Sequence, residues 1–298
     1  MLPGRKANAG DALSLLHDYY KLFRFEHAVM LAVAVLIAEI ITVGWLPPLE
    51  TVFLLSMAVP IFSEMASFAL NDYLDVEADR INGMLERPLV KGTIAPRTAF
   101  CLSALFFAIS IISGFLINEA AFLIALFFNA FAIAYNWKLK DLPLLGNAFI
   151  ASTMAIPFIF GGYVYSADPP AVIWDIALLG FIAGLAREIV KSAEDMKGDV
   201  EARKSRTLPV MIGRGPSLFI ASMLFLFFIP LTIVPFMGEL TLRFASGFFL
   251  FLADISILII ALYLLYARRD KTFALVRKYS LAALFCGLLS LLLASIGF

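Results

Sequence analysis

Nine runs of apolar residues, each close to the length of a membrane-spanning helix, dominate this sequence. A helix needs about 20 apolar residues to cross the hydrocarbon layer. The runs cover residues 28–46, 50–70, 98–117, 120–137, 143–165, 170–191, 217–237, 244–266 and 273–296. Because 62% of the residues are hydrophobic and only 15% are charged, lipid must replace water around much of the surface. The sequence therefore predicts an all-α, polytopic membrane protein of about nine transmembrane helices.

The basic residues predict how this protein is oriented in the membrane. If all nine runs are helices, 22 of the 23 Lys and Arg residues fall in the N-terminal segment, in alternate loops or beside those loops, and only Arg243 falls on the other side. Loops on the cytoplasmic side are enriched in Lys and Arg. We therefore predict that the N-terminus is inside and the C-terminus is outside.

The chain divides into a short leader and one membrane domain. Residues 1–27 form a predicted cytoplasmic segment, which contains an amphipathic helix on the membrane surface because its apolar residues recur at helical spacing. These residues are Leu13, Leu16, Tyr20 and Phe23. Residues 28–298 form a single transmembrane domain. Its long loops, 71–92 and 192–215, each contain carboxylates and follow helices that are four apart, which predicts two related halves at 28–142 and 143–271.

Three aspartates in the first long loop predict a metal site. Asp72, Asp75 and Asp79 stand at i, i+3 and i+7, so on a helix they share one face, with Asn71 beside them. Carboxylates this close repel one another, and partial desolvation at the membrane makes a compensating cation necessary. Oxygen ligands without nearby His or Cys select a hard ion, which indicates magnesium before zinc.

The second long loop carries a similar cluster. A helix that continues into it would place a stripe of basic and acidic side chains on one face, at Arg187, Lys191, Asp195 and Asp199. Mg²⁺ commonly bridges carboxylates to phosphate oxygens, so two facing clusters with basic side chains would clamp a diphosphate. The apolar helices would hold a long isoprenoid tail. A solvated helix end is the alternative interpretation of each acidic run.

Three further carboxylates lie inside predicted helices. Glu39, Glu64 and Asp254 fall within apolar runs. Acidic residues at such depth either pair with another helix or line a pathway. Pairing is the interpretation that we favour for all three.

Both clusters resemble the motifs of a known family. The string Asn71-Asp72-x-x-Asp75-x-x-x-Asp79 resembles the first aspartate motif of the UbiA superfamily of intramembrane prenyltransferases. The stretch from 187 to 199, with 206–209 after it, is similar to the second motif and the loop that follows. Ser192 stands where relatives often carry another Asp. The resemblance covers essentially the whole chain, and it implies helices around a central cavity under a cytoplasmic cap.

The resemblance, with the charge pattern, implies roles for individual residues. The catalytic carboxylates would be Asp72, Asp75, Asp195 and Asp199, and the Mg²⁺ ligands would be Asn71, Asp72, Asp75, Asp79, Asp195 and Asp199. The diphosphate would be held by Arg87, Lys91, Tyr135, Lys138, Lys140 and Lys191. The family's Tyr-x-x-x-Lys element is irregular here, because Leu139 stands four residues after Tyr135, so Lys138 and Lys140 are both candidates.

The resemblance also implies the substrates. The segments REIVKSAEDMKGD and YNWKLK most resemble the archaeal members that transfer a geranylgeranyl group to geranylgeranylglyceryl phosphate in ether-lipid synthesis. Arg24 would bind the phosphate of this acceptor. An equally suitable role is to keep the N-terminal end of the first membrane helix on the cytoplasmic side, as basic residues do. The expected partners are a prenyl diphosphate, a lipid-like acceptor and membrane lipid. Nucleic acid is excluded, since the net charge is zero.

Other functions fit the sequence less well. The closest alternative within the family is prenylation of an aromatic acid on the route to a quinone. A carboxylate-dependent transporter would concentrate ionisable groups near the bilayer midplane, whereas most carboxylates here follow the ends of apolar runs. A CDP-alcohol phosphotransferase would carry a DGxxAR signature, which this sequence lacks.

Overall fold

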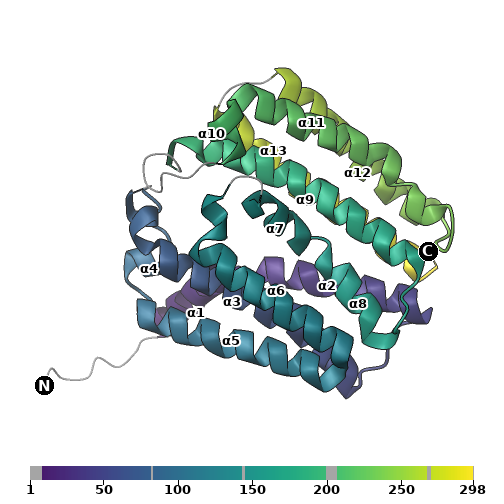
Figure 1. The fold of residues 1–298 in the computed structure, drawn as a ribbon, viewed down its shortest axis with the longest axis horizontal. Coiled ribbons are helices and arrows are strands. Elements are labelled where there is room, and N and C mark those ends of the chain that lie inside the picture. The colour runs from purple at the N-terminus through teal and green to yellow at the C-terminus, as the bar shows by residue number, and fades with distance from the viewer. Residues whose placement is uncertain (1–8, 82, 143–144, 199–206, 267–269, 298) are drawn as a thin grey trace, which may run out of the picture.

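The computed structural model describes residues 9–81, 83–142, 145–198, 207–266 and 270–297, and long α-helices dominate these ranges (Figure 1). The long helices run side by side and are α2 (Phe25–Val43), α3 (Thr51–Ile81), α5 (Pro96–Ile117), α6 (Glu119–Trp137), α9 (Ala171–Gly198), α11 (Arg214–Leu231), α12 (Phe244–Tyr266) and α13 (Asp270–Ser295). The shorter elements are α1 (Ala9–Phe23), α4 (Pro88–Lys91), η1 (Leu139–Asp141), α7 (Leu145–Thr153), α8 (Ile156–Tyr165), α10 (Leu208–Ile212) and η3 (Val234–Phe236).

The described helices confirm an all-α protein with several apolar, membrane-length segments. In these ranges seven helices are long and apolar enough to cross a membrane, and an eighth span results if α7 and α8 are taken together. Helix α9 has the length of a span but carries charges at Asp175, Arg187, Glu188 and Lys191. The total of about nine spans therefore stays a prediction.

The expectation of one uninterrupted helix over 143–165 is wrong. The described part of this range forms α7 and α8, which are bent by 45° relative to each other. Pro157 stands in the first turn of α8. It has no N–H to bond to the Thr153 carbonyl, and its ring would clash there in a continuous helix. The break packs closely on α9, because a Cβ atom added at Gly180 would overlap the Met154 carbonyl oxygen.

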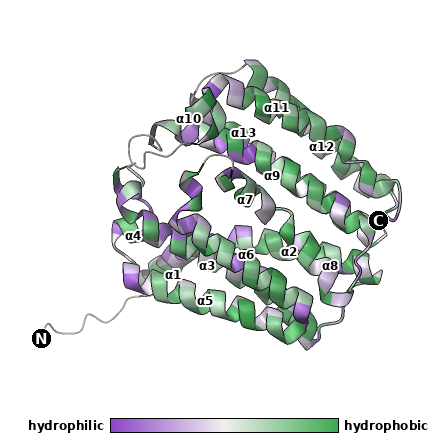
Figure 2. Cartoon of the chain, in the orientation of Figure 1, coloured by the Kyte–Doolittle hydropathy of each residue, from purple (hydrophilic) through white to green (hydrophobic). Residues whose placement is uncertain are grey.

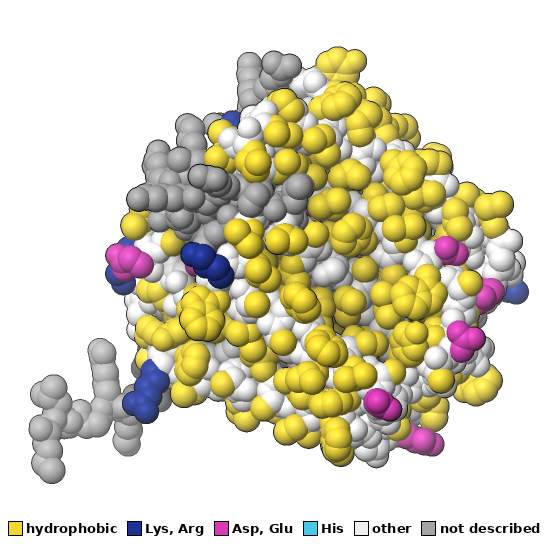
Figure 3. Space-filling view, viewed as in Figure 1, with side chains coloured by type: hydrophobic (Ala, Val, Ile, Leu, Met, Phe, Trp, Pro, Cys, Tyr) yellow, Lys and Arg dark blue, Asp and Glu magenta, His cyan; other side chains and the backbone are white. Residues whose placement is uncertain are grey.

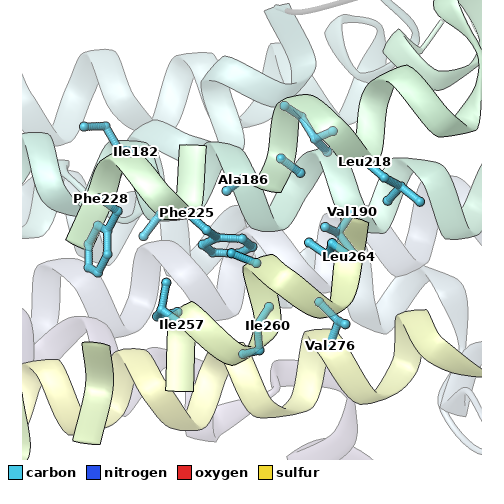
Figure 4. Close-up of a cluster of buried hydrophobic side chains, with 14 of the residues drawn as sticks. Ile182, Ala186, Val190, Leu218, Phe225, Phe228, Ile257, Ile260, Leu264 and Val276 are labelled. Carbon is cyan, nitrogen blue, oxygen red and sulfur yellow. The ribbon is translucent and has the colours of Figure 1, made fainter. Parts of the chain in front are cut away.

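Two groups of helices make up the fold. In the C-terminal group, apolar side chains from α9, α11, α12 and α13 meet in one cluster, with Phe225 fully buried among Ile182, Ile257 and Ile260 (Figure 4). In the N-terminal group, α3 packs against α5, where serine hydroxyls donate to backbone carbonyls of α3. Ser103 Oγ lies 2.8 Å from the Ala66 oxygen. These contacts hold α3, which carries the aspartates.

The outer surface is apolar, with polar margins. Figure 3 shows a broad hydrophobic face, with Lys and Arg side chains near its left edge and most of the visible Asp and Glu side chains toward its right edge. Figure 2 shows hydrophilic residues near α4 at that left end. The predicted amphipathic segment is confirmed as helix α1, whose Leu13 and Leu16 are exposed. Its position on a membrane surface remains a prediction.

Candidate functional site

The C-terminal end of α3 carries three buried aspartates. Asp72, Asp75 and Asp79 are only 2%, 6% and 3% exposed, and their spacing places them on one face of the helix, as predicted. Asn71, which precedes them, is partly buried. Because burying a carboxylate without compensation is costly, this face requires positive charge.

Each of these aspartates is paired with a cation from another segment of the chain. Arg87 Nη1 lies 3.0 Å from Asp72 Oδ1 and 2.5 Å from Asp79 Oδ2. Arg24 Nη2 approaches Asp72 Oδ1 to 3.2 Å, and Lys140 Nζ approaches Asp75 Oδ1 to 2.6 Å. Three segments far apart in sequence therefore converge on one end of α3.

Local backbone geometry explains why two of these cations reach the cluster. Arg87 is extended, as a residue before proline prefers, and it opens the short helix α4. Arg24 separates α1 from α2 with a left-handed backbone (φ 45°, ψ 53°), which costs roughly 1–2 kcal/mol for a residue of this type. Its guanidinium lies 4.2 Å above the Phe68 ring. Burial lowers the pKa of Arg24, and the Asp72 carboxylate opposes that shift.

The second cluster lies at the end of α9. Asp195 is partly buried on this helix, whereas Asp199 lies outside the described residues. Glu194 Oε2 pairs with Arg277 Nη1 of α13 at 2.7 Å. Ser192 is buried and donates to Asn147 Oδ1 of α7 at 3.4 Å. Ser192, which stands where the family resemblance implies another Asp, therefore joins α9 to α7.

The predicted diphosphate residues fall into two sets. Arg87 and Lys140 contact the aspartates directly, so the choice between Lys138 and Lys140 favours Lys140, since Lys138 is exposed. The other residues lie against different partners. Lys91 Nζ is 3.6 Å from Asp18 Oδ1, Lys191 Nζ is 3.4 Å from Glu188 Oε1, and the Tyr135 ring stacks on Phe149 at 5.1 Å.

An apolar cavity of 170 Å³ lies between the two groups of helices. Its walls come mainly from α2, α9 and α13, and the few polar side chains in them include His27, Glu64 and Thr153. Glu64 stands eight residues before Asp72 on α3, about 12 Å along the helix axis. The cavity therefore offers space for a hydrocarbon chain with the charged cluster beyond one end.

The carboxylates inside the helices differ from one another. Asp254 Oδ2 accepts a hydrogen bond from Thr232 Oγ1 at 3.0 Å, so the predicted pairing between segments is confirmed for Asp254. Glu39 is fully buried, and neither of its carboxylate oxygens has a hydrogen-bond partner among the described residues. Glu64 lines the cavity, which agrees with the alternative interpretation that it lines a pathway.

The donor set fits magnesium that arrives with a substrate. In the described ranges, no three His, Cys, Asp or Glu side chains stand close enough together to form a metal site by themselves. Mg²⁺ does not need such a cage, because it usually takes one or two carboxylates and completes its shell with water and phosphate oxygens. Asp72 and Asp75 offer oxygen ligands of this kind. The buried cluster suits a phosphate-bound hard ion better than zinc.

Sequence reasoning did not identify two residues that organise this region. Asp18 of α1 is 2% exposed and contacts Lys91, and Arg277 of α13 holds Glu194. Both pairs join residues that are far apart in the sequence, so no local spacing reveals them. The position of Asp18 within the amphipathic pattern of α1 was the one feature of the sequence that could have indicated its contact.

Comparisons with known proteins identify what the chain is similar to. The model of the UbiA prenyltransferase family matches residues 29–289. A digeranylgeranylglyceryl phosphate synthase from Archaeoglobus fulgidus is 30% identical over 286 residues, which are 95% of this chain and 97% of that protein.

Solved structures share the fold. The structure of a digeranylgeranylglyceryl phosphate synthase matches with a TM-score of 0.75 and 25% identity, over 96% of this chain and 100% of that one. A UbiA homolog from Archaeoglobus fulgidus, bound to GPP and Mg²⁺, matches with a TM-score of 0.63 and 20% identity, over 94% of this chain and 100% of that one.

Replacing Arg87 tests how far the cluster depends on charge pairing. Arg87→Ala should lower thermal stability in detergent, because two buried carboxylates share this guanidinium and breaking a buried pair costs about 3–5 kcal/mol. Arg80→Ala is the matched control, since Arg80 pairs with Glu77 on the same helix in an exposed pair that contributes little. An unchanged unfolding midpoint for Arg87→Ala would contradict the pairing.

Proposed function

This chain belongs to the UbiA prenyltransferase family, and we propose that it transfers a geranylgeranyl group from geranylgeranyl diphosphate to geranylgeranylglyceryl phosphate, with Mg²⁺ as cofactor. The observation that carries the proposal is the buried aspartate and cation cluster beyond one end of an apolar cavity. A prenyl diphosphate has a matching shape, with one charged end and one hydrocarbon chain. Relatives named for this reaction match the chain over nearly its whole length.

The diphosphate would bind at the aspartates of α3 and α9. Asp72, Asp75 and Asp195 would hold the cofactor, together with Asn71, Asp79 and Asp199. Bound Mg²⁺ supplies positive charge that stabilises the departing diphosphate. Arg87 and Lys140, which neutralise these carboxylates here, would then be available to bind phosphate oxygens.

The basic side chains would complete the diphosphate site. Arg87 and Lys140 are placed for this role, because both lie against the aspartates and form strong charge-assisted hydrogen bonds with anions. Lys91, Lys138, Lys191 and Tyr135 would form its outer part. Preorganised positive charge at this end lowers the barrier for the allylic carbon–oxygen bond to break.

The transfer would proceed through an allylic cation. The carbon–oxygen bond breaks and its electron pair leaves with the diphosphate. The hydroxyl oxygen of the acceptor then bonds to the cationic carbon, and the hydroxyl proton passes to the released diphosphate. The apolar cavity keeps water away from this cation, and aromatic faces such as Phe158 and Phe228 can stabilise it. Arg24, beside Asp72, would bind the acceptor's phosphate.

The active site would face the cytoplasm. All described Lys and Arg residues except Arg243 lie in or near segments predicted to be inside, which supports an N-inside, C-outside orientation. The segments 71–92 and 192–215, which begin on the last turns of α3 and α9, would then cap the cavity from the cytoplasmic side. The two halves at 28–142 and 143–271 would each contribute one aspartate cluster.

Removal of the metal ligands tests the proposed chemistry. Asp72→Ala and Asp195→Ala should each reduce geranylgeranyl transfer to background while the protein stays folded in detergent, because these carboxylates hold Mg²⁺. Transfer is measured as radiolabelled lipid product from geranylgeranyl diphosphate. EDTA should abolish it in the wild type and Mg²⁺ should restore it. Full turnover by both variants at saturating Mg²⁺, or restoration by Zn²⁺ alone, would refute the two-cluster site.

Labelling of single cysteines tests the orientation. With Cys101 and Cys286 replaced by serine, a cysteine placed at residue 90 or 205 should react with a membrane-impermeant maleimide only when the cytoplasmic side is accessible. A cysteine at Glu239, an exposed residue predicted to be outside, is the matched control and should show the opposite pattern. Reaction of residue 90 from outside would reverse the orientation.

A further inference from the structure

Arg187 continues the face of α9 that lines the cavity. Ile176, Gly180 and Ala183 of this helix form part of the cavity wall, and Arg187 follows Ala183 by four residues, which places it on the same face one turn further on. The α2 wall of the cavity likewise begins at His27. These two residues therefore lie at the end of the cavity that is nearest the aspartates.

The guanidinium of Arg187 is not neutralised in the way that the other site cations are. Its Nη1 atom is buried and has no hydrogen-bond partner in the described part of the chain. Glu188 attracts it, but the Oε1 atom of Glu188 lies against Lys191, and Arg277 of α13 repels it. Arg24, Arg87 and Lys140 instead each contact an aspartate directly.

A second arginine, Arg24, lies near the same histidine as Arg187. The charges of Arg24 and Arg187 both act on the imidazole of His27 in α2, so both guanidinium groups lie near it. Two guanidinium groups and an imidazole thus come together near one end of the cavity from two parts of the chain, the start of α2 and the C-terminal half of α9. A buried donor without a partner is unfavourable unless a ligand satisfies it. The ligand that suits this set of groups is an anion.

We propose that Arg187 binds the phosphate of the lipid acceptor at the mouth of the cavity, together with Arg24 and His27. This assignment rests on the proposed function and adds a residue to the acceptor site. The diphosphate already has Arg87, Lys140 and metal, whereas Arg187 Nη1 has no hydrogen-bond partner among the described residues. Its planar guanidinium is suited to two parallel hydrogen bonds with a phosphate. The acceptor's hydrocarbon chain would then extend into the cavity beside the prenyl group.

Two acceptors that differ only in the phosphate test this site. The wild type should transfer to geranylgeranylglyceryl phosphate with a kcat/KM at least about tenfold higher than to geranylgeranylglycerol, because a charge-assisted contact is worth roughly ten- to a hundredfold. Arg187→Met should remove most of this preference by raising the KM for the phosphorylated acceptor, while the KM for geranylgeranyl diphosphate stays unchanged. Arg97→Ala, which replaces an exposed arginine, is the control and should keep the preference.

The thermal stability of the same variants separates binding from structure. Without substrate, Arg187→Met should unfold at the same temperature as the wild type or higher, because it removes a buried guanidinium nitrogen that no described residue hydrogen-bonds. Geranylgeranylglyceryl phosphate should raise the unfolding midpoint of the wild type more than that of Arg187→Met, and geranylgeranylglycerol should raise both equally. A lower midpoint without substrate, or a preference for phosphate that survives in Arg187→Met, would overturn the assignment. Stabilisation of the wild type without any transfer would refute the proposed function but leave the anion site.

Discussion

The pairing of three buried aspartates with cations from distant segments is the interaction on which the site depends. Asp72, Asp75 and Asp79 lie at the end of a membrane-length helix, where carboxylates are costly unless they are neutralised. Arg24, Arg87 and Lys140 supply that neutralisation, and in doing so they fix the junction of α1 and α2, the start of α4 and the turn after α6. The charges that organise the fold at this end are thus also the charges that a diphosphate would need.

The two ends of the site differ in how their charge is compensated. At α3, each aspartate already has a basic partner. A diphosphate that binds there with its metal ion would therefore replace existing ion pairs with new ones. At α9, Arg187 has a buried nitrogen that makes no hydrogen bond within the described ranges. This difference explains how one cavity could hold two phosphorylated lipids, with the diphosphate at the metal and the single phosphate at a preformed cationic site. In this proposal the apolar cavity beside both clusters would hold the hydrocarbon chains and keep water away from them.

Local features of this structure were predictable from the sequence, whereas long-range contacts were not. Hydropathy predicted the long helices, and helical spacing predicted the shared face of Asp72, Asp75 and Asp79, because both follow from neighbouring residues. The break between α7 and α8 was missed, although Pro157 marks it, because no charged residue interrupts the run. The choice between Lys138 and Lys140 and the contact of Lys91 with Asp18 depend on how separate helices meet, which spacing does not encode.

The identity of the product tests the central claim most directly. Purified protein is incubated with radiolabelled geranylgeranyl diphosphate, Mg²⁺ and two acceptors in competition, geranylgeranylglyceryl phosphate and an aromatic acid, and the labelled lipid is identified by mass spectrometry. The account predicts a glycerol phosphate that carries two geranylgeranyl ethers, with one diphosphate released per transfer. Label found mainly on the aromatic acid would contradict it and would indicate a quinone-pathway enzyme instead.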